Sequence, residues 1–186
     1  MKYNIAFLTI VSCGLLFLGC KDEVLPKPKA ELRLEYSRPE RGELATDYFS
    51  FEFNERAKVD QKNSTSLTLR YPELKGEVFI NYRKVEGNID KLLSDAQKLS
   101  YEHSVKADGI LEQPFINKEN GVYGMFYEVT GNAASQAQFY ATDSTEHFLT
   151  GSLYFMSRPN YDSIYPAAAY LQNDIRRIME TLKWRD

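Results

Sequence analysis

The chain has 186 residues, with 23 lysines and arginines against 26 aspartates and glutamates, and a formal net charge of −3 at pH 7. This mild acidity, without a basic patch, is not the composition of a nucleic-acid-binding protein. Its two cysteines, Cys13 and Cys20, both lie near the start, so the remainder can form no disulfide framework and offers no thiolate for catalysis or for a metal.

The first 19 residues show the pattern of a secretory signal peptide. Lys2 gives the start a positive charge, residues 5–18 are apolar or small, and Gly19 stands directly before Cys20. A helix needs about 20 apolar residues to cross a bilayer, so this segment is too short for a permanent membrane span. We therefore expect residues 1–19 to be removed on export.

The end of this segment, Phe17-Leu18-Gly19-Cys20, resembles the bacterial lipobox, in which the cysteine receives a lipid and becomes the first residue. Phe17 stands where that motif usually has leucine, valine or isoleucine. The alternative is a plain signal peptide that is cleaved nearby and leaves Cys20 as a free thiol. Because the signal and the cysteine agree in position, we expect lipidation at Cys20 and a membrane as one partner.

Residues 20–29 are typical of an extended tether, because Pro26 and Pro28 restrict the backbone. Within it, Lys21-Asp22-Glu23 resembles the export signal that sends some lipoproteins of the Bacteroidetes to the cell surface. The same residues suit a solvated linker, and both interpretations stay open. Residues 30–186 are expected to form a single domain.

Apolar residues that alternate with polar ones predict strands in the first part of that domain. The expected strands cover residues 32–36, 49–53, 67–71 and 78–82. Between the first two, the proline and the glycine in residues 37–47 predict a loop.

A change of period then predicts a helix. Apolar residues recur every three or four positions from Ile89 to Leu99, which is the spacing of one helix face. Asn88 is a good N-cap and Gly109 a good stop, so we expect an amphipathic helix over residues 89–108.

Strand signals return after this helix. Pro114 predicts that the strand at residues 110–116 lies near a sheet edge, and Asn120-Gly121 is a strong hairpin signal. A continuous apolar stripe predicts a last helix over residues 163–183, whose first turn tolerates Pro166. Three further strands should form a meander, at residues 122–130, 135–142 and 147–157.

The predicted order of elements is strands, helix, strands, helix. It indicates an α+β domain with a mainly antiparallel sheet and two main helices packed on it. The stripe of the last helix is interpreted as core packing against the sheet rather than as a coiled coil. The order resembles that of the Mog1/PsbP-like fold, a likeness that carries no function.

Residue types that carry catalysis are sparse. His103 lies at the edge of the predicted helix stripe, where packing is the simplest explanation. His147 follows Asp143-Ser144-Thr145, which holds the residue types of a hydrolase triad, but residues crowded into one turn seldom converge on one substrate atom. Motifs for metals and nucleotides are missing from the sequence. We therefore expect no catalytic residue, no metal and no cofactor, and hence not an enzyme.

The exact amino-acid sequence of residues 95–184 is more informative than its hydrophobic periodicity. It includes QPFINK at 113–118, VYGMFYEV at 122–129, GNAASQAQFY at 131–140 and FLTGSLYF at 148–155. Over this stretch, and less densely from Pro26 onward, the chain resembles the gliding motility lipoprotein GldD family of the Bacteroidetes. The resemblance implies an envelope lipoprotein needed for gliding and associated with type IX secretion, with proteins of that machinery as partners. It implies no catalytic residue, and Cys20 is the only functional residue that it transfers.

Two functional interpretations follow. The first is a non-enzymatic assembly or stabilising factor in the cell envelope, lipid-anchored to a membrane and facing the periplasm or the cell surface. The second is a module that binds a glycan or a peptide through the meander. A polar sheet face that no helix covers would favour binding, and a covered face would favour packing. The candidate contact residues are Tyr123, Tyr127, Asn132, Gln136, Gln138 and Tyr140.

The turn at residues 131–135 is a further candidate contact, because its small residues allow a close approach of another backbone. The alternative is a plain tight turn. Neither interpretation involves a nucleic acid or a nucleotide.

Overall fold

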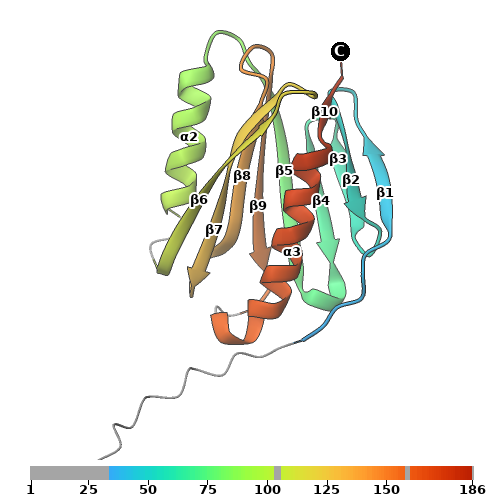
Figure 1. The fold of residues 1–186 in the computed structure, drawn as a ribbon, viewed down its shortest axis with the longest axis vertical. Helices are drawn as coiled ribbons and strands as arrows, with labels where there is room; N and C mark the ends of the chain where they lie inside the picture. The colour runs from blue at the N-terminus through green and yellow to red at the C-terminus, as the bar shows by residue number, and fades with distance from the viewer. Residues whose placement is uncertain (1–33, 103–105, 158–159, 186) are drawn as a thin grey trace, which may run out of the picture. The chain divides into compact units, whose positions relative to one another are not determined.

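Antiparallel strands make up most of the fold (Figure 1). The computed structural model describes residues 34–102, 106–157 and 160–185, which belong to one compact unit. The main sheet has seven strands in the order β3-β4-β5-β9-β8-β7-β6, and a smaller sheet has the order β1-β2-β10. All neighbouring strands pair antiparallel. The strands are β1 Arg41–Ala45, β2 Phe49–Asn54, β3 Lys58–Asn63, β4 Ser66–Tyr71, β5 Gly76–Lys84, β6 Ala107–Asn117, β7 Val122–Gly131, β8 Ser135–Thr142, β9 His147–Phe155 and β10 Lys183–Trp184.

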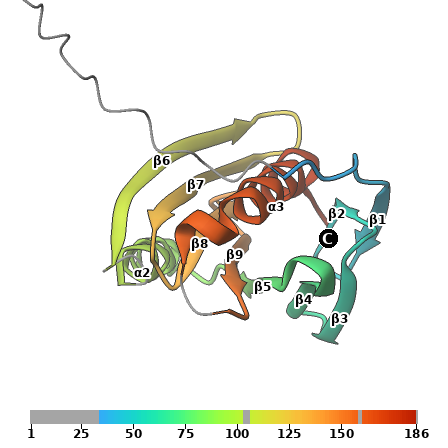
Figure 2. The same ribbon diagram turned by 90° about the horizontal axis from the view of Figure 1, so that it is seen from below.

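Two helices pack on opposite faces of the main sheet. The helices are α2 Ile89–Glu102 and α3 Tyr161–Thr181, with the short 3-10 helix η1 at Pro72–Leu74. On β8, Phe139 packs in the same core as Leu171 of α3. Its neighbour Tyr140 points the other way and packs with Leu92 of α2, because successive strand residues face opposite sides. Figure 2 shows β6 and β7 curling around α3.

The main core lies between the sheet, α3 and β2. The predicted stripe of α3 forms its helical side, and Leu171, Ile175 and Ile178 have almost no exposed surface. From β2, Phe49 and Phe51 pack into the same cluster. Full burial of each such side chain contributes about 1.5–3 kcal/mol, so this contact explains why α3 and β2 close over one face of the sheet.

The predicted α+β class is confirmed. The meander of β7, β8 and β9 and the hairpin at Asn120-Gly121 are both present, and Gly121 has the positive φ of 62° that this turn requires. Pro114 lies in β6, which is the last strand of the main sheet, as its proline predicts. The likeness to the Mog1/PsbP-like fold stays a prediction.

The start of the domain differs from the prediction. Residues 34–40 have no regular structure, so the strand expected at 32–36 is wrong over its described part, and Leu34 is exposed. The expected loop at 37–47 contains β1, which pairs with β2 as a hairpin. In the described part of the chain, residues 34–36 have no strand beside them, whereas β1 pairs with β2 through the short turn that follows it.

The helix expected to reach residue 108 ends at Glu102. Its apolar stripe already stops at Leu99, and Ala107 opens β6 instead. Gly109 does not end the helix but follows an irregularity in the pairing of β6 with β7, where glycine is also common. Pro166 lies beyond the first turn of α3, and Figure 1 shows that first turn bent away from the rest of the helix.

Several predictions concern residues that the structure does not describe. The signal segment, Cys20, the tether at residues 20–29, and His103 all lie outside the described ranges. Within those ranges, no helix combines the length and the apolar character that a membrane span needs.

Candidate functional site

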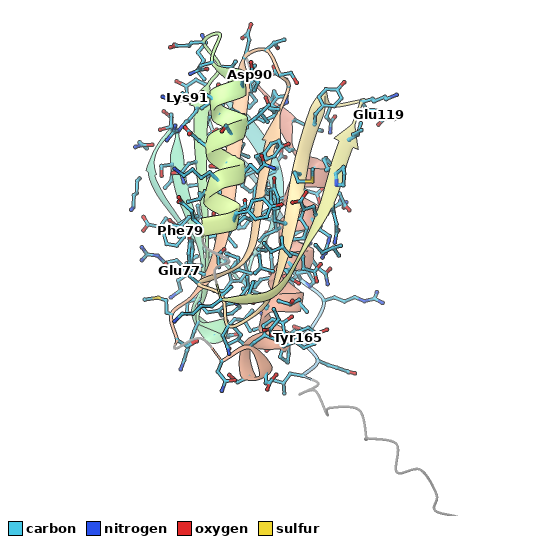
Figure 3. All side chains as sticks on the ribbon, turned by 90° about the vertical axis from the view of Figure 1, so that its left-hand side faces the viewer. Glu77, Phe79, Asp90, Lys91, Glu119 and Tyr165 are labelled. Atoms are coloured by element: carbon cyan, nitrogen blue, oxygen red, sulfur yellow. The ribbon has the colours of Figure 1, made fainter. Side chains whose placement is uncertain are left out.

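A groove of about 330 Å³ opens between α2 and the strands β6, β7 and β8. We call it the α2 groove. Figure 3 looks onto α2, with Asp90 near one end of the helix and Glu119 at the turn between β6 and β7. The described residues that line the groove are Asp90, Leu93, Ser94 and Gln97 of α2, Glu112 of β6, Met125 and Tyr127 of β7, and Tyr140 of β8.

Local geometry places these side chains together. The helix residues are spaced by three or four positions and so share one face of α2. On the sheet, Glu112 pairs with Tyr127, and Met125 pairs with Tyr140, so the four side chains lie on the same face. The Tyr140 ring stacks on Phe148, with ring centroids 5.8 Å apart, which fixes its orientation at the floor of the groove.

The tyrosines of this region remain protonated at neutral pH. Burial raises the pKa of Tyr127 to about 12 and also raises the pKa of Tyr140. Tyr101 lies one turn beyond Gln97 on α2 and donates a hydrogen bond to Glu112. This hydrogen bond raises the pKa of Tyr101 as well. The groove therefore presents neutral hydroxyls, ring faces and two carboxylates. Its described lining holds no histidine or lysine.

Three of the predicted contact residues are buried: Gln136, Gln138 and Tyr127, of which Tyr127 is 3% exposed and lines the α2 groove. Gln136 is 1% exposed and Gln138 is 2% exposed, so neither side chain can reach a partner in this conformation. The side-chain amide of Gln136 donates to the carbonyl oxygens of Gly131 and Ala133, which closes the turn before β8. Gln138 lies beneath α2, where the Ser100 hydroxyl donates to its side-chain oxygen. A sheet face covered by a helix favours packing over ligand binding, so these two glutamines contribute to packing.

Strict alternation along β8 would place Gln136, Gln138 and Tyr140 on one face, but this alternation is interrupted. The pairing of β8 with β9 shifts between Ser135 and Ala137, and this irregularity takes Gln136 out of the period of two. The main-chain oxygen of Gln136 accepts a hydrogen bond from Gln172 of α3. The structure therefore brings Tyr127 and Tyr140 together at the α2 groove but leaves Gln136 in the turn.

Asn132 and Tyr123 are the exposed members of the predicted set. The Asn132 side-chain oxygen accepts a hydrogen bond of 2.9 Å from the backbone N–H of Tyr161 and so ties the turn at residues 131–135 to the start of α3. Gly131 has a φ of 91°, a positive value that glycine adopts readily in a tight turn. These contacts explain the shape of the turn, and its role as a partner contact stays a prediction.

Tyr123 belongs to an exposed apolar surface that the sequence interpretation missed. It pairs with Ile116 of β6, which is 63% exposed, and Leu111 on the opposite face of the same strand is 57% exposed. We define the β6 edge as residues 107–117, whose outer backbone side pairs with no strand in the described part of the chain. The signal was present in the sequence, because residues 107–117 contain no lysine or arginine to protect an outer strand.

A comparison with protein families decides the identity. The model of the family described as gliding motility lipoprotein GldD matches residues 21–184. The chain belongs to the GldD family. The resemblance seen in the sequence is thereby confirmed, and membership makes the chain a lipid-anchored protein of the cell envelope that is associated with gliding motility. A search of curated proteins gave no match.

In this GldD-family chain, the residues that suggested a triad have other partners. The Asp143 carboxylate accepts from the backbone N–H groups of Thr145, Glu146 and His147 at 2.8–2.9 Å. Burial raises the pKa of Asp143, but these hydrogen bonds outweigh it and hold the pKa below its usual value. His147 Nδ1 lies 2.9 Å from the Tyr82 hydroxyl, and its ring stacks on Trp184. The cluster shapes a turn and packs one end of the sheet.

The other titratable cluster of the GldD-family chain surrounds Asp174 of α3. Its carboxylate lies 2.8 Å from the Arg41 guanidinium and accepts from the Asn54 side chain at 2.6 Å. The Asn54 amide also donates to Tyr170, and Tyr71 lies close enough for the Asp174 charge to add to the effect of burial, which raises the pKa of Tyr71. The cluster joins β1, β2, β4 and α3. In the described part of the chain, no three histidine, cysteine, aspartate or glutamate side chains are placed to hold a metal ion.

Proposed function

We propose that this GldD-family protein is required for gliding motility, for the type IX secretion that supports it, or for both, as a non-enzymatic assembly or stabilising factor. It acts through contacts with other proteins of that machinery. Membership of the GldD family carries the proposal, and the exposed apolar β6 edge supports it as a surface of the kind that marks interaction sites with other proteins or with a second copy of the chain. The α2 groove supports a binding role, because its lining offers tyrosine rings with their hydroxyls and two carboxylates.

Cys20 is proposed as the site of lipidation. Cys20→Ala should abolish incorporation of labelled palmitate and release the protein from the membrane fraction, because acyl chains supply the anchor at about 0.8 kcal/mol per buried methylene. Cys13→Ala is the matched control, since Cys13 lies in the signal segment, and it should keep the label. Label that persists in Cys20→Ala would remove this assignment.

An in-frame deletion in the native bacterium, scored for colony spreading and for secreted proteins, tests the proposed role. We expect loss of spreading together with loss of secretion. Complementation then tests the surface: Ile116→Lys on the β6 edge should fail to restore both, while Val59→Lys should restore them. Val59 is the matched control, because it is also exposed but lies on β3, at the opposite edge of the main sheet.

Normal spreading and secretion in the deletion strain would contradict the proposed function. The ligand-binding interpretation would then take its place, and the α2 groove is the observation that favours it. Its aromatic floor of Tyr127 and Tyr140, with the carboxylates of Asp90 and Glu112 above, suits the hydroxyls of a glycan or the amides of a peptide.

A further inference from the structure

The two outer strands of the main sheet differ in their charges: β3 carries two lysines, whereas β6 has no lysine or arginine and is protected only by Asp108, Glu112 and Pro114. β3 carries Lys58, Asp60 and Lys62, charges that discourage an outer strand from pairing with another chain. β6 is 11 residues long and exposes Leu111 and Ile116. In the described part of the chain no strand pairs with its outer side, so a row of backbone donors and acceptors faces outward.

Pro114 shows which residues of β6 carry those free groups. A proline is tolerated in a sheet where its nitrogen faces away from the neighbouring strand, so Pro114 directs its backbone outward and Gln113 directs its own toward β7. Because the direction alternates, Ile110, Glu112 and Ile116 share the outward orientation of Pro114. The four-residue turn that follows the pair of Asn117 with Val122 agrees with this phase, since hairpins usually close on a hydrogen-bonded pair.

The sequence of β6 is self-complementary about Gln113. When two copies pair antiparallel with their two-fold axis at Gln113, Ile110 lies opposite Ile116, and Leu111 lies opposite Phe115. Asp108 and Lys118, which flank the regular part of β6, carry opposite charges and come to the same end of the paired segment from the two copies. The outward groups of Ile110 and Ile116 can exchange both hydrogen bonds, and the Glu112 N–H can donate to the Pro114 oxygen.

The two pairings in which the axis moves by one residue, to Glu112 or to Pro114, are less favourable. An axis at Glu112 places two glutamates directly opposite each other, which is repulsive. An axis at Pro114 places the two copies of this proline opposite each other. Proline has no backbone N–H, so the central hydrogen bonds are lost. Charge and backbone chemistry thus select the axis at Gln113.

We propose that β6 pairs with β6 of a second copy of this chain, with the two-fold axis at Gln113, to form one continuous sheet through both molecules. The apolar side chains that the single chain exposes, Leu111 and Ile116, are then covered by Phe115 and Ile110 of the second copy. The inference does not depend on the role in motility, because it uses only the backbone and side chains of β6.

Cysteine cross-linking in the full-length protein, in its own membrane, tests the register. Across a non-hydrogen-bonded antiparallel pair the Cα atoms lie about 4.5 Å apart, within the range of a disulfide, so Gln113→Cys should give a covalent dimer on mild oxidation. Glu112→Cys is the matched control. Its two copies lie diagonally, about 7–8 Å apart, and should give no dimer. The parent chain with its native cysteines measures the background.

Each outcome bears on the proposal. A dimer from Gln113→Cys alone supports it, whereas a dimer from Glu112→Cys, from both variants equally, or from neither overturns it. Adding Ile116→Lys to Gln113→Cys should remove the dimer, because a lysine in the paired row opposes edge pairing. Adding Val59→Lys should leave the dimer unchanged. A dimer that survives Ile116→Lys also overturns the proposal, whatever the complementation result.

Discussion

Gly151→Ala is expected to lower the free energy of unfolding by about 3 kcal/mol, at the upper end of what overpacking of a core usually costs. Gly151 of β9 pairs with Phe139 of β8, and the Phe139 ring covers the glycine. A β-carbon at Gly151 would lie 2.6 Å from Cζ and 2.8 Å from Cδ1 of this ring, and still closer to Cε1. The ring is buried in the main core, so it cannot rotate away without displacing its neighbours.

A double-mutant cycle separates this clash from other effects of the substitution. In a Phe139→Ala background the ring is absent, and Gly151→Ala should then stabilise the protein by about 0.5–1 kcal/mol, because alanine is preferred over glycine inside a strand. Chemical denaturation of the four proteins gives the coupling. Gly109→Ala is a control in another strand, where a β-carbon meets only the Thr130 hydroxyl at 3.2 Å. Equal losses in both backgrounds would contradict the explanation.

The elements that the sequence predicted well are those in which one signal dominates. The stripe of α3 is continuous, and burial of Leu171, Ile175 and Ile178 follows from its spacing alone. The hairpin at Asn120-Gly121 follows from local turn chemistry. Both signals lie within a few residues of the element that they specify, so no knowledge of tertiary contacts is needed.

The missed elements depend on partners that are distant in sequence or weak in pattern. β3 is charged along its length and exists because it pairs with β4. β10 has two residues, which pair with β2, and the Trp184 indole donates to the Gly121 oxygen. No period of two can appear in so short or so polar a segment.

The candidate site was predicted in part for the same reason. Alternation along β8 puts Gln138 and Tyr140 on one face, and the pairing with β7 adds Tyr127 to it. Whether that face is open depends on where α2 packs, and α2 lies over β8, so Gln138 became internal. The pairing irregularity that removes Gln136 from this face has no signal in the sequence. Pro114, by contrast, was sufficient to place β6 at the sheet edge.

The second large effect is expected at Asp174. Its side chain is 3% exposed, and Arg41, its ion-pair partner, is 29% exposed. Asp174→Ala should lower the free energy of unfolding by about 3 kcal/mol, because it leaves Arg41 without its counter-charge and the buried Asn54 amide without its carboxylate acceptor. We expect the lower end of the usual range for a broken buried pair, since water reaches Arg41. Glu52→Ala is the control, because its contact with Arg177 is half exposed, and it should cost less than about 1 kcal/mol.

The pKa of Asp174 also predicts how the contribution of this residue to the free energy of unfolding changes with pH, which its packing alone does not. Burial raises the pKa of Asp174, and the opposing effects of Asn54 and Arg41 are smaller. The folded state then binds the proton more tightly than the unfolded state does. The stability that this confers is fully present below the unfolded pKa of about 4 and is lost as the pH rises through the folded pKa. The stability difference between the parent protein and Asp174→Asn should therefore shrink as the pH rises from about 4 toward neutrality. Denaturant melts of both proteins across this range measure it. A difference that grows with pH would mean that the Arg41 ion pair outweighs burial, and that the carboxylate is held charged rather than penalised.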